Sequence, residues 1–490
     1  MGCGEGADMP ELSARRRLLV LAICCMSLFI VGIDNTIVNV ALPSIAHAFD
    51  PSSLSGDVSS LQWVVDAYVV VLASLLILGG SMGDRFGRRR VFQTGLALFT
   101  LGSLACSLAP GLGWLVGARM LQAVGGSMLN PVAMGIITNT FTDPKERARA
   151  IGVWGAVAGV ALALGPLAGG VLTQTIGWHA IFWINVPIGA LALWLTARYV
   201  PESRAPHPRQ PDPVGQSLLL VGLAALVYAV IETERGATVS GCAALVAALA
   251  TAGLVAYERR RHEPLLDIRF FHSLPFSAAT AIAVCMFAAF GGFLFLNSIY
   301  LQEVRGLSAF AAGMMIASCA LPVIVVSPIS GRLVGTHGAR PSLLVSGAAL
   351  TLSALLMTQL QAHTPLVALI AVYALFGVGF GMVNAPVTFA AVSGMPRAQA
   401  GLASAVASTS RQVGVSIGVA LAGALAGVPG GHDAGGWTDF PKATHSYWWI
   451  LVCLGVLICV LGMVSTGARA RASTARIAHL LEEPGSGVAV

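Results

Sequence analysis

Apolar runs of about 20 residues recur along the whole of this 490-residue chain. A helix of that length crosses the roughly 30 Å hydrocarbon core of a bilayer. Only 10% of the residues are charged, whereas soluble domains carry about 25%. A soluble core of this size would need more polar surface. The sequence therefore predicts an all-α membrane protein that crosses the bilayer many times.

Clusters of glycine, proline and charged residues divide the chain into fourteen apolar segments. The first segment is too long for the apolar core of a cleaved signal peptide and lacks a convincing cleavage site, so we expect it to be the first span. The predicted limits are 18–46, 61–80, 91–109, 112–138, 148–173, 180–199, 214–233, 238–257, 275–301, 308–334, 341–360, 365–392, 401–427 and 446–467.

Basic residues lie almost entirely on one side of the predicted spans. Of 28 lysines and arginines, 23 fall on the side of the N-terminus and two, Arg119 and Arg411, fall within spans. The other side holds only Arg235, Arg305 and Lys442. Because loops rich in Lys and Arg stay in the cytoplasm, both termini are predicted to be cytoplasmic, in a plasma membrane of bacterial type. This placement also speaks against nucleic-acid binding, despite the net charge of +6.

The longest inner connections bracket the seventh and eighth segments, so six segments precede this pair and six follow it. A cationic turn after the second segment, GDRFGRRR, has a weak echo, GRLVGTHGAR, at 331–340, in which Gly335 occupies the acidic position. The predicted division is a tail at 1–17, a six-helix half at 18–200, a linker at 201–274 with extra helices at about 214–233 and 238–257, a second six-helix half at 275–467, and a tail at 468–490.

Four short motifs follow one another through the first half of the chain. The first is DNTIVNVALP, from Asp34 to Pro43, and the third is the pair Arg119 and Gln122. The second is the cationic turn at 79–92, with marked positions Gly80, Asp84, Arg85, Gly87, Arg88 and Arg89. The fourth is GPLAGG, with Gly165, Pro166, Gly169 and Gly170.

Together these motifs resemble the 14-span drug:proton antiporter branch of the major facilitator superfamily. The resemblance implies two six-helix halves with two extra central helices, and a proton-driven exporter of amphipathic drugs or antibiotics that works by alternating access. It implies no catalytic residue, no metal, no cofactor other than the proton, and function as a monomer. The alternative with the same fold is an exporter or symporter of one metabolite, siderophore or lipid.

A membrane enzyme or sensor is a further alternative, from a different functional class. The sequence has no soluble catalytic domain and no P-loop for ATP-driven export. Its nine cysteines are scattered without the spacing of metal ligands or a disulfide framework. The sequence thus favours a transporter over an enzyme.

Ionisable residues inside a bilayer are costly and therefore mark candidate functional sites. Asp34 lies about 24 Å from the inner surface at 1.5 Å per residue. Asp66 and Arg119 enter their spans from the outer side, so the three share the outer half of the membrane. We expect a carboxylate–guanidinium cluster that loads and releases a proton. The alternatives are a static ion pair and, for Asp66, a hydrated acid at the interface.

The remaining motif residues are expected to act in conformational change. The glycines of the cationic turn permit a tight bend, and Asp84 is expected either to pair with local arginines or to face a helix N-terminus of the other half. Pro166 interrupts the fifth span, while Gly169 and Gly170 allow helices to approach closely. The alternative roles are setting topology and ordinary helix packing.

Direct substrate contacts are the least specific prediction. Aromatic and amide groups in spans near a central cavity could bind large amphipathic or cationic compounds. The alternative for each residue is packing or contact with lipid, and for Arg411 it is a bond to backbone carbonyls. The candidates are Asn39, Trp63, Gln122, Asn297, Asn384 and Arg411.

Overall fold

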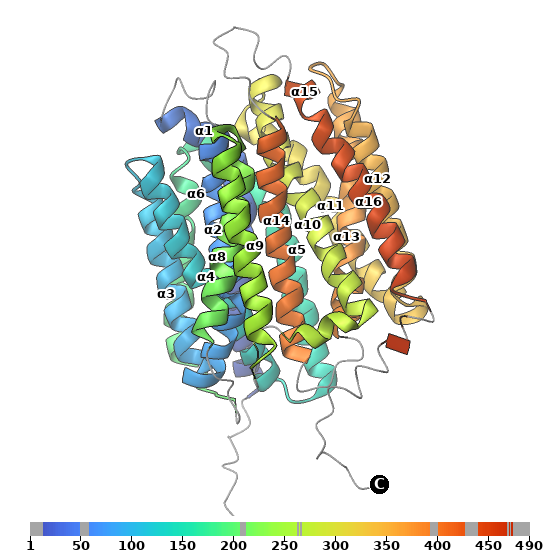
Figure 1. Cartoon of the computed structure of the whole chain (residues 1–490). Coiled ribbons are helices and arrows are strands. Elements are labelled where there is room, and N and C mark those ends of the chain that lie inside the picture. Colours follow the sequence, from blue (N-terminus) through green and yellow to red (C-terminus); the bar gives the residue numbers. More distant parts are fainter. Residues whose placement is uncertain are drawn as a thin grey trace, which may run out of the picture.

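In the residues that the computed structural model describes, the regular elements are all helices (Figure 1). The structure describes residues 13–49, 58–205, 212–261, 264, 267–392, 400–426, 440–467, 470 and 472–473. The first helices are α1 (Ala14–Phe49), α2 (Val58–Phe86), α3 (Arg88–Ser107), α4 (Leu112–Thr140), α5 (Pro144–Thr175), α6 (Ala180–Trp183) and α7 (Asn185–Tyr199). The next are α8 (Pro213–Ile231), η2 (Glu232–Arg235), α9 (Ala237–Glu258), η3 (Ile268–His272), α10 (Leu274–Ile299) and the π-helix η4 (Tyr300–Val304). The last are α11 (Ala309–His337), α12 (Ala339–Met357), α13 (Leu366–Val392), α14 (Ala400–Ala426), α15 (Phe440–Ala443) and α16 (His445–Val464).

Every predicted apolar segment coincides with a helix to within a few residues, but the predicted count of spans is not confirmed. Among the described residues, 12 helices are long and apolar enough to cross a membrane. The predicted spans at 91–109 and 401–427 correspond to α3 and α14, which are not among them. Both carry charge, three arginines at the start of α3 and Arg411 in α14, and this charge lowers their mean hydropathy.

Local sequence signals explain where several helices begin. Asp143 accepts hydrogen bonds from the backbone of Lys145 and Glu146 and so caps α5, which starts at a proline. Asp212 caps α8 in the same way, also before a proline. An acidic cap followed by proline at the first helical position satisfies donors that have no partner within the helix.

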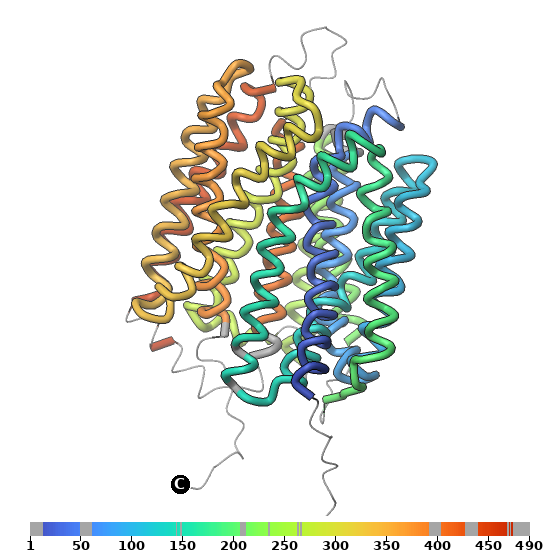
Figure 2. Tube along the Cα trace, turned by 180° about the vertical axis from the view of Figure 1, so that it is seen from behind, coloured from blue at the N-terminus to red at the C-terminus, as the bar shows by residue number. Residues whose placement is uncertain are grey.

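The helices form two groups with a pair between them. One group is α1–α7, in which α3 and α2 pack on α4 and α1 packs on α5. The other is α10–α16, in which α10 packs on α14, α11 on α13 and α12 on α16. The groups meet mainly where α2 packs on α14 and α5 on α11, the latter visible from behind (Figure 2). The hairpin of α8 and α9 lies beside α2 and α14, so it borders both groups (Figure 1).

The two ends of the bundle differ in how the groups are joined. We call the end at which α1 begins the near face, at the bottom of Figure 1, and the end at which α1 ends the far face. Toward the far face, Ser298 donates to the carbonyl of Asn39 and Gln302 donates to that of Val40 over 2.9 Å. Nearby, His47 and Glu303 approach to 3.4 Å. The hydrogen bonds found between the groups in the described residues all lie toward this face, so the described conformation is closed there.

Candidate functional site

A fully buried ion pair lies in the middle of the first helix group. The Arg119 guanidinium from α4 donates to the Asp34 carboxylate from α1 over 2.6 Å. The exposed fractions of the two side chains are 1% and 0%. Two charges at this depth have lost their water shells, and only close pairing with further hydrogen bonds offsets that cost. The prediction that these two residues meet is therefore confirmed.

Neutral polar side chains complete the hydrogen bonding of this carboxylate. The amide of Gln122 donates to Asp34 over 2.8 Å and to the hydroxyl of Ser103 over 2.7 Å. The amide of Asn185, at the start of α7, donates to Asp34 over 3.2 Å. The two amide groups therefore hold the carboxylate in a fixed orientation. Asp34 thus receives donors from α4 and α7.

The Arg119 guanidinium is held on its other sides as well. Its Nε donates to the carbonyl of Val64 over 3.2 Å, and its NH1 also donates to the side-chain oxygen of Gln122 over 2.7 Å. The ring of Tyr68 lies 4.0 Å from the guanidinium carbon, at a distance typical of cation–π contact. Because α2 supplies both Val64 and Tyr68, the ion pair ties α1, α2 and α4 together.

Asp66 does not join this ion pair, which corrects the expectation of one cluster. Its carboxylate is fully buried and accepts a hydrogen bond from the Ser416 hydroxyl over 2.7 Å. Ser416 lies on α14, in the second helix group, so the bond crosses between the groups. The other carboxylate oxygen, Oδ2, has no hydrogen-bond partner among the described residues. Asp66 faces α14 because the helical register turns it away from the side of α2 that holds Tyr68.

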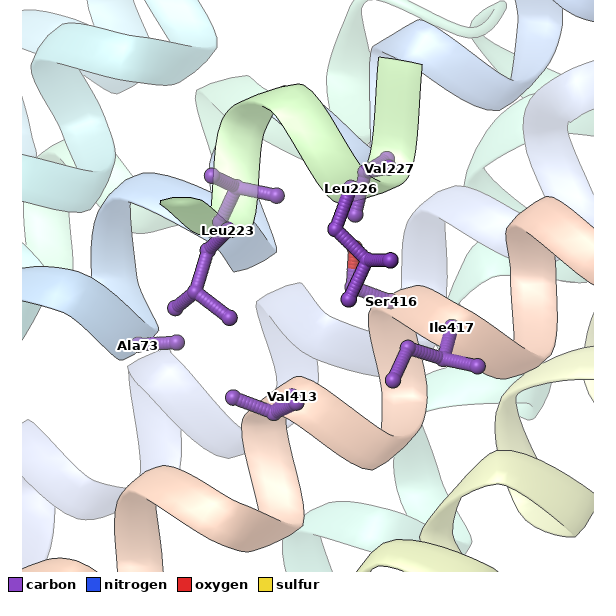
Figure 3. Close-up of a pocket in the computed structure, with 8 residues that line it drawn as sticks. Ala73, Leu223, Leu226, Val227, Val413, Ser416 and Ile417 are labelled. Atoms are coloured by element: carbon purple, nitrogen blue, oxygen red, sulfur yellow. The ribbon is translucent and has the colours of Figure 1, made fainter. Parts of the chain in front are cut away.

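An apolar pocket lies where α2, α8 and α14 meet, next to this bond. In Figure 3 the side chains of α8 and α14 point into the space between the two helices, and Ser416 lies at its edge. Its lining is Val70, Ala73, Leu223, Leu226, Val227, Val413, Ser416 and Ile417. Apolar side chains of α8 and α14 thus face each other next to the Asp66–Ser416 bond.

The cationic turn is built around a glycine that no other residue can replace without strain. Gly87 has φ +110°, between α2 and α3. A Cβ atom added there would lie 2.6 Å from Oε1 of Glu202. The same Glu202 oxygen accepts from the backbone amide of Arg89 over 3.1 Å. The turn therefore wraps closely around one carboxylate beyond the end of α7.

The charged residues of the turn pair locally. Arg88 donates to Oδ1 of Asp84 over 2.8 Å and to the carbonyl of Gly135 on α4 over 3.2 Å. Arg89 donates to the carbonyl of Ala197 on α7 over 2.5 Å. The first of the two predicted partners of Asp84, a local arginine, is present in this conformation. All of these contacts stay within the first helix group and the segment that follows it.

The GPLAGG motif lies where three helices approach closely. A Cβ atom on Gly165 would overlap the hydroxyl of Thr36 on α1. One on Gly169 would lie 2.8 Å from the carbonyl of Ile37, also on α1. One on Gly170 would lie 2.6 Å from the carbonyl of Ala309 at the start of α11. The motif thus packs α5 against α1 on one side and against the second helix group on the other.

The predicted substrate residues do not converge on one place. Gln122 belongs to the ion-pair network, and Asn39 lies at the contact between α1 and α10. Trp63 turns toward α8, where its indole donates to Glu232 over 3.1 Å, which corrects its expected position near a central cavity. The Asn297 side chain bonds with Tyr373 inside the second helix group.

Asn384 and Arg411 lie near each other, on α13 and α14. The Arg411 NH2 donates to Thr388 over 2.6 Å, one helical turn from Asn384. Arg411 thus donates to a side-chain hydroxyl and not to a backbone carbonyl, the acceptor expected if it served only helix packing.

Sequence reasoning missed several residues that complete these contacts. Ser103, Asn185, Glu202 and Ser416 all accept or donate at the sites described above. Asn185 and Ser416 are polar residues inside long apolar runs, and that signal was available. Ser103 and Glu202 carry no distinguishing pattern, since their role depends on which helix lies opposite.

Comparison with known proteins places the chain in a family. Residues 24–419 match the model of the Major Facilitator Superfamily. The chain is 37% identical to the multidrug resistance protein Stp of Mycobacterium tuberculosis over 403 residues, which are 82% of this chain and 74% of that protein. It is 31% identical to the riboflavin transporter RibZ of Clostridioides difficile over 401 residues, 81% of this chain and 86% of that protein.

The fold also resembles that of solved transporter structures. The structure of a D-xylose–proton symporter superimposes with a TM-score of 0.65 at 15% identity, covering 91% of this chain and 97% of that one. Likeness at this identity concerns the fold alone. The family match covers most of the chain, and the relatives are transport proteins. This chain belongs to the Major Facilitator Superfamily and is a membrane transport protein, not an enzyme.

Proposed function

We propose that this protein is a proton-driven exporter of amphipathic drugs or antibiotics that works by alternating access. The proposal includes fourteen spans, with α3 and α14 crossing the membrane beside the twelve more apolar helices. It places the near face in the cytoplasm, because the exposed arginines gather there. The two helix groups are then the two six-helix halves, with α8 and α9 as the extra pair.

The buried pair of Asp34 and Arg119 is the observation that carries this proposal. Arginine stays charged at all physiological pH values, so Asp34 is the member of the pair that exchanges the proton. When Asp34 takes up a proton, Arg119 loses its counterion and must find another acceptor. A change of conformation that reopens the site to water relieves this cost. Proton binding is thereby linked to the movement of α1 against α4.

The bond from Ser416 to Asp66 supplies a second link, this time between the halves. Asp66 is buried where α14 packs against α2, toward the far face. Separation of these helices would expose the carboxylate to water. The protonation of Asp66 and the closure of the far face are then coupled, since a ligand shifts an equilibrium by its difference in affinity for the two states.

The cationic turn acts as the latch of the near face in this proposal. In the described conformation Asp84 forms an ion pair with Arg88, inside the first half. When the near face closes, we expect Asp84 to turn toward a helix N-terminus of the second half, where negative charge is favoured.

Transport of a single metabolite is the second candidate, because a riboflavin transporter is 31% identical over most of this chain. The two candidates differ in the breadth of the cargo and share the fold and the proton sites. A panel of structurally unrelated compounds separates them. Export of several unrelated drugs supports the first candidate, and export of one compound class supports the second.

The test is transport by the purified protein in proteoliposomes with an imposed pH gradient. Dye movement that follows the gradient and is lost in Asp34→Asn supports proton coupling. The matched control is Asp267→Asn, because Asp267 also pairs with an arginine, Arg269, but lies outside the spans. Movement that ignores the gradient, or that persists in Asp34→Asn, contradicts the role of Asp34.

A further inference from the structure

Arg411 is a cation in the middle of α14 whose hydrogen bonding is incomplete. Its NH2 donates to the Thr388 hydroxyl over 2.6 Å, whereas its Nε is buried and has no acceptor among the described residues. The side chain as a whole is partly exposed, as is that of Asn384 on α13. A guanidinium offers five donors, so this one retains unused capacity on an accessible side.

No acidic residue on the long helices of the second group balances the charge of Arg411. Helices α10, α11, α12, α13, α14 and α16 contain no Asp or Glu at all. No ion pair among the described residues includes Arg411, and Asp66, an acid on the helix α2 that packs on α14, is bonded to Ser416. The other membrane arginine, Arg119, by contrast, has its carboxylate at 2.6 Å. A partly buried cation without a counterion is destabilising, and an anion bound beside it would reduce that cost.

Aromatic rings lie beside this cation. The guanidinium carbon is 5.9 Å from the ring centroid of Phe287 on α10. Phe287 contacts Phe380 on α13 at 5.1 Å, and Phe380 stacks on Phe290 at 4.4 Å. Phe290 and Phe380 are buried and support Phe287, whose partly exposed ring offers a flat apolar face to which another aromatic ring can add. Cation and rings come from three helices of the second half.

We infer that Arg411 binds the acidic oxygen, a phenolate or carboxylate, of an aromatic substrate whose ring packs on Phe287. The inference rests on the proposed export function and names its substrate class. Charge-assisted bonds from a guanidinium to such an oxygen are strong and directional. The same fixed positive charge repels cationic compounds, so the site favours anionic over cationic substrates in two ways. Arg411 is thus a specificity-determining residue, separate from the proton sites.

Two xanthene dyes of similar ring shape and opposite charge, fluorescein and rhodamine 123, test this inference. Equilibrium binding to the purified protein is measured by fluorescence anisotropy, without a proton gradient. We expect the wild type to bind the anionic fluorescein at least about tenfold more tightly, since tenfold corresponds to one modest charge-assisted bond. Arg411→Gln should weaken fluorescein binding about tenfold and leave rhodamine 123 unchanged or tighter.

Further variants separate charge from folding. Arg411→Lys should retain a preference for fluorescein, and Arg411→Glu should reverse it toward rhodamine 123. Arg332→Gln is the matched control, because Arg332 is an exposed arginine of α11 in the same half. Equal binding of the two dyes by the wild type, or fluorescein binding that is unaffected by Arg411→Gln, overturns the inference. Since binding needs no gradient, a failure of proton coupling in proteoliposomes leaves this result interpretable on its own.

Discussion

The Arg119 guanidinium lies 2.6 Å from the Asp34 carboxylate, and neither side chain has appreciable contact with solvent. A pair in this setting has an asymmetric response to mutation. Removing one member leaves an uncompensated buried charge, whereas removing both leaves a polar network of amides and hydroxyls that can rearrange. Stability and transport should therefore respond differently to single and double substitutions.

The first prediction compares Arg119→Gln with the double variant Asp34→Asn/Arg119→Gln. The single substitution should destabilise the protein by about 3–5 kcal/mol, as is typical when one partner of a buried pair is removed. The double variant should recover much of that loss but should not transport. Thermal unfolding in detergent and drug uptake into inverted vesicles provide the two readouts. A double variant no more stable than the single one would contradict energetic coupling between the residues.

The second prediction concerns the bond between the halves. Ser416→Ala removes one hydrogen bond to Asp66 and should weaken closure of the far face by about 1 kcal/mol, or roughly fivefold in population. Spin labels at Ile176, directly after α5, and at Leu366 on α13, both exposed at the far face, report the separation of the halves by pulsed electron paramagnetic resonance.

The control for this measurement lies two turns away on the same helix. The Ser410 hydroxyl bonds only to the carbonyl of Val406 within α14. Ser410→Ala should leave the distance distribution as in the wild type. A shift of equal size in both variants would mean that α14 itself is perturbed and that the Asp66 bond does not hold the far face.

The arrangement of the ion pair illustrates what the sequence could and could not provide. Asp34 and Arg119 are charged residues in apolar runs at similar depth, and depth alone suggested that they meet. Depth also suggested that Asp66 joins them, which is wrong, because depth says nothing about which side of a helix a residue occupies. The period of 3.6 residues per turn places Tyr68 toward Arg119 and Asp66 toward α14.

Contacts with segments far away in the chain could not be predicted from the sequence either, because the sequence pattern does not say which helices are neighbours. Glu202 accepts a bond from the amide of Arg89, 113 positions earlier in the chain, and this contact exists only because α7 ends beside the cationic turn. Trp63 is an aromatic residue of the kind that often lines a ligand cavity, but its side chain contacts Glu232 next to α8. Helix positions followed from apolar length, whereas helix neighbours depend on packing that the linear pattern does not encode.

The third prediction separates backbone strain from crowding at the cationic turn. Gly87→Ala places a side chain at φ +110° and 2.6 Å from Glu202, so it should lower the thermal stability and the yield of folded protein. Gly236 has a similar backbone conformation, with φ +117°, but no atom lies within 4 Å of the Cβ that Gly236→Ala would add. We expect a loss of roughly 1–2 kcal/mol for Gly236→Ala from strain alone and a larger loss for Gly87→Ala.

The measurement is thermal unfolding of both purified variants beside the wild type. Equal losses in the two variants would show that strain accounts for the whole effect and that the contact with Glu202 adds nothing. In that case Glu202→Gln should also be silent. A larger loss in Gly87→Ala supports the close wrapping of the turn around this carboxylate.

The last prediction tests whether GPLAGG closes the far face. An added methyl group on Gly170 would lie 2.6 Å from the Ala309 carbonyl, in the contact between α5 and α11. Gly170→Ala must push these helices apart, because backbone atoms cannot give way as a flexible side chain can. It should widen the distance between labels at Ile176 and Leu366 and reduce transport. Gly159→Ala, on the same helix with nothing within 4 Å, is the control and should change neither. If Gly170→Ala leaves the label distance as in the wild type, α11 accommodates the added methyl group locally, and closure of the far face then depends on the contacts of α1 with α10 and of α2 with α14.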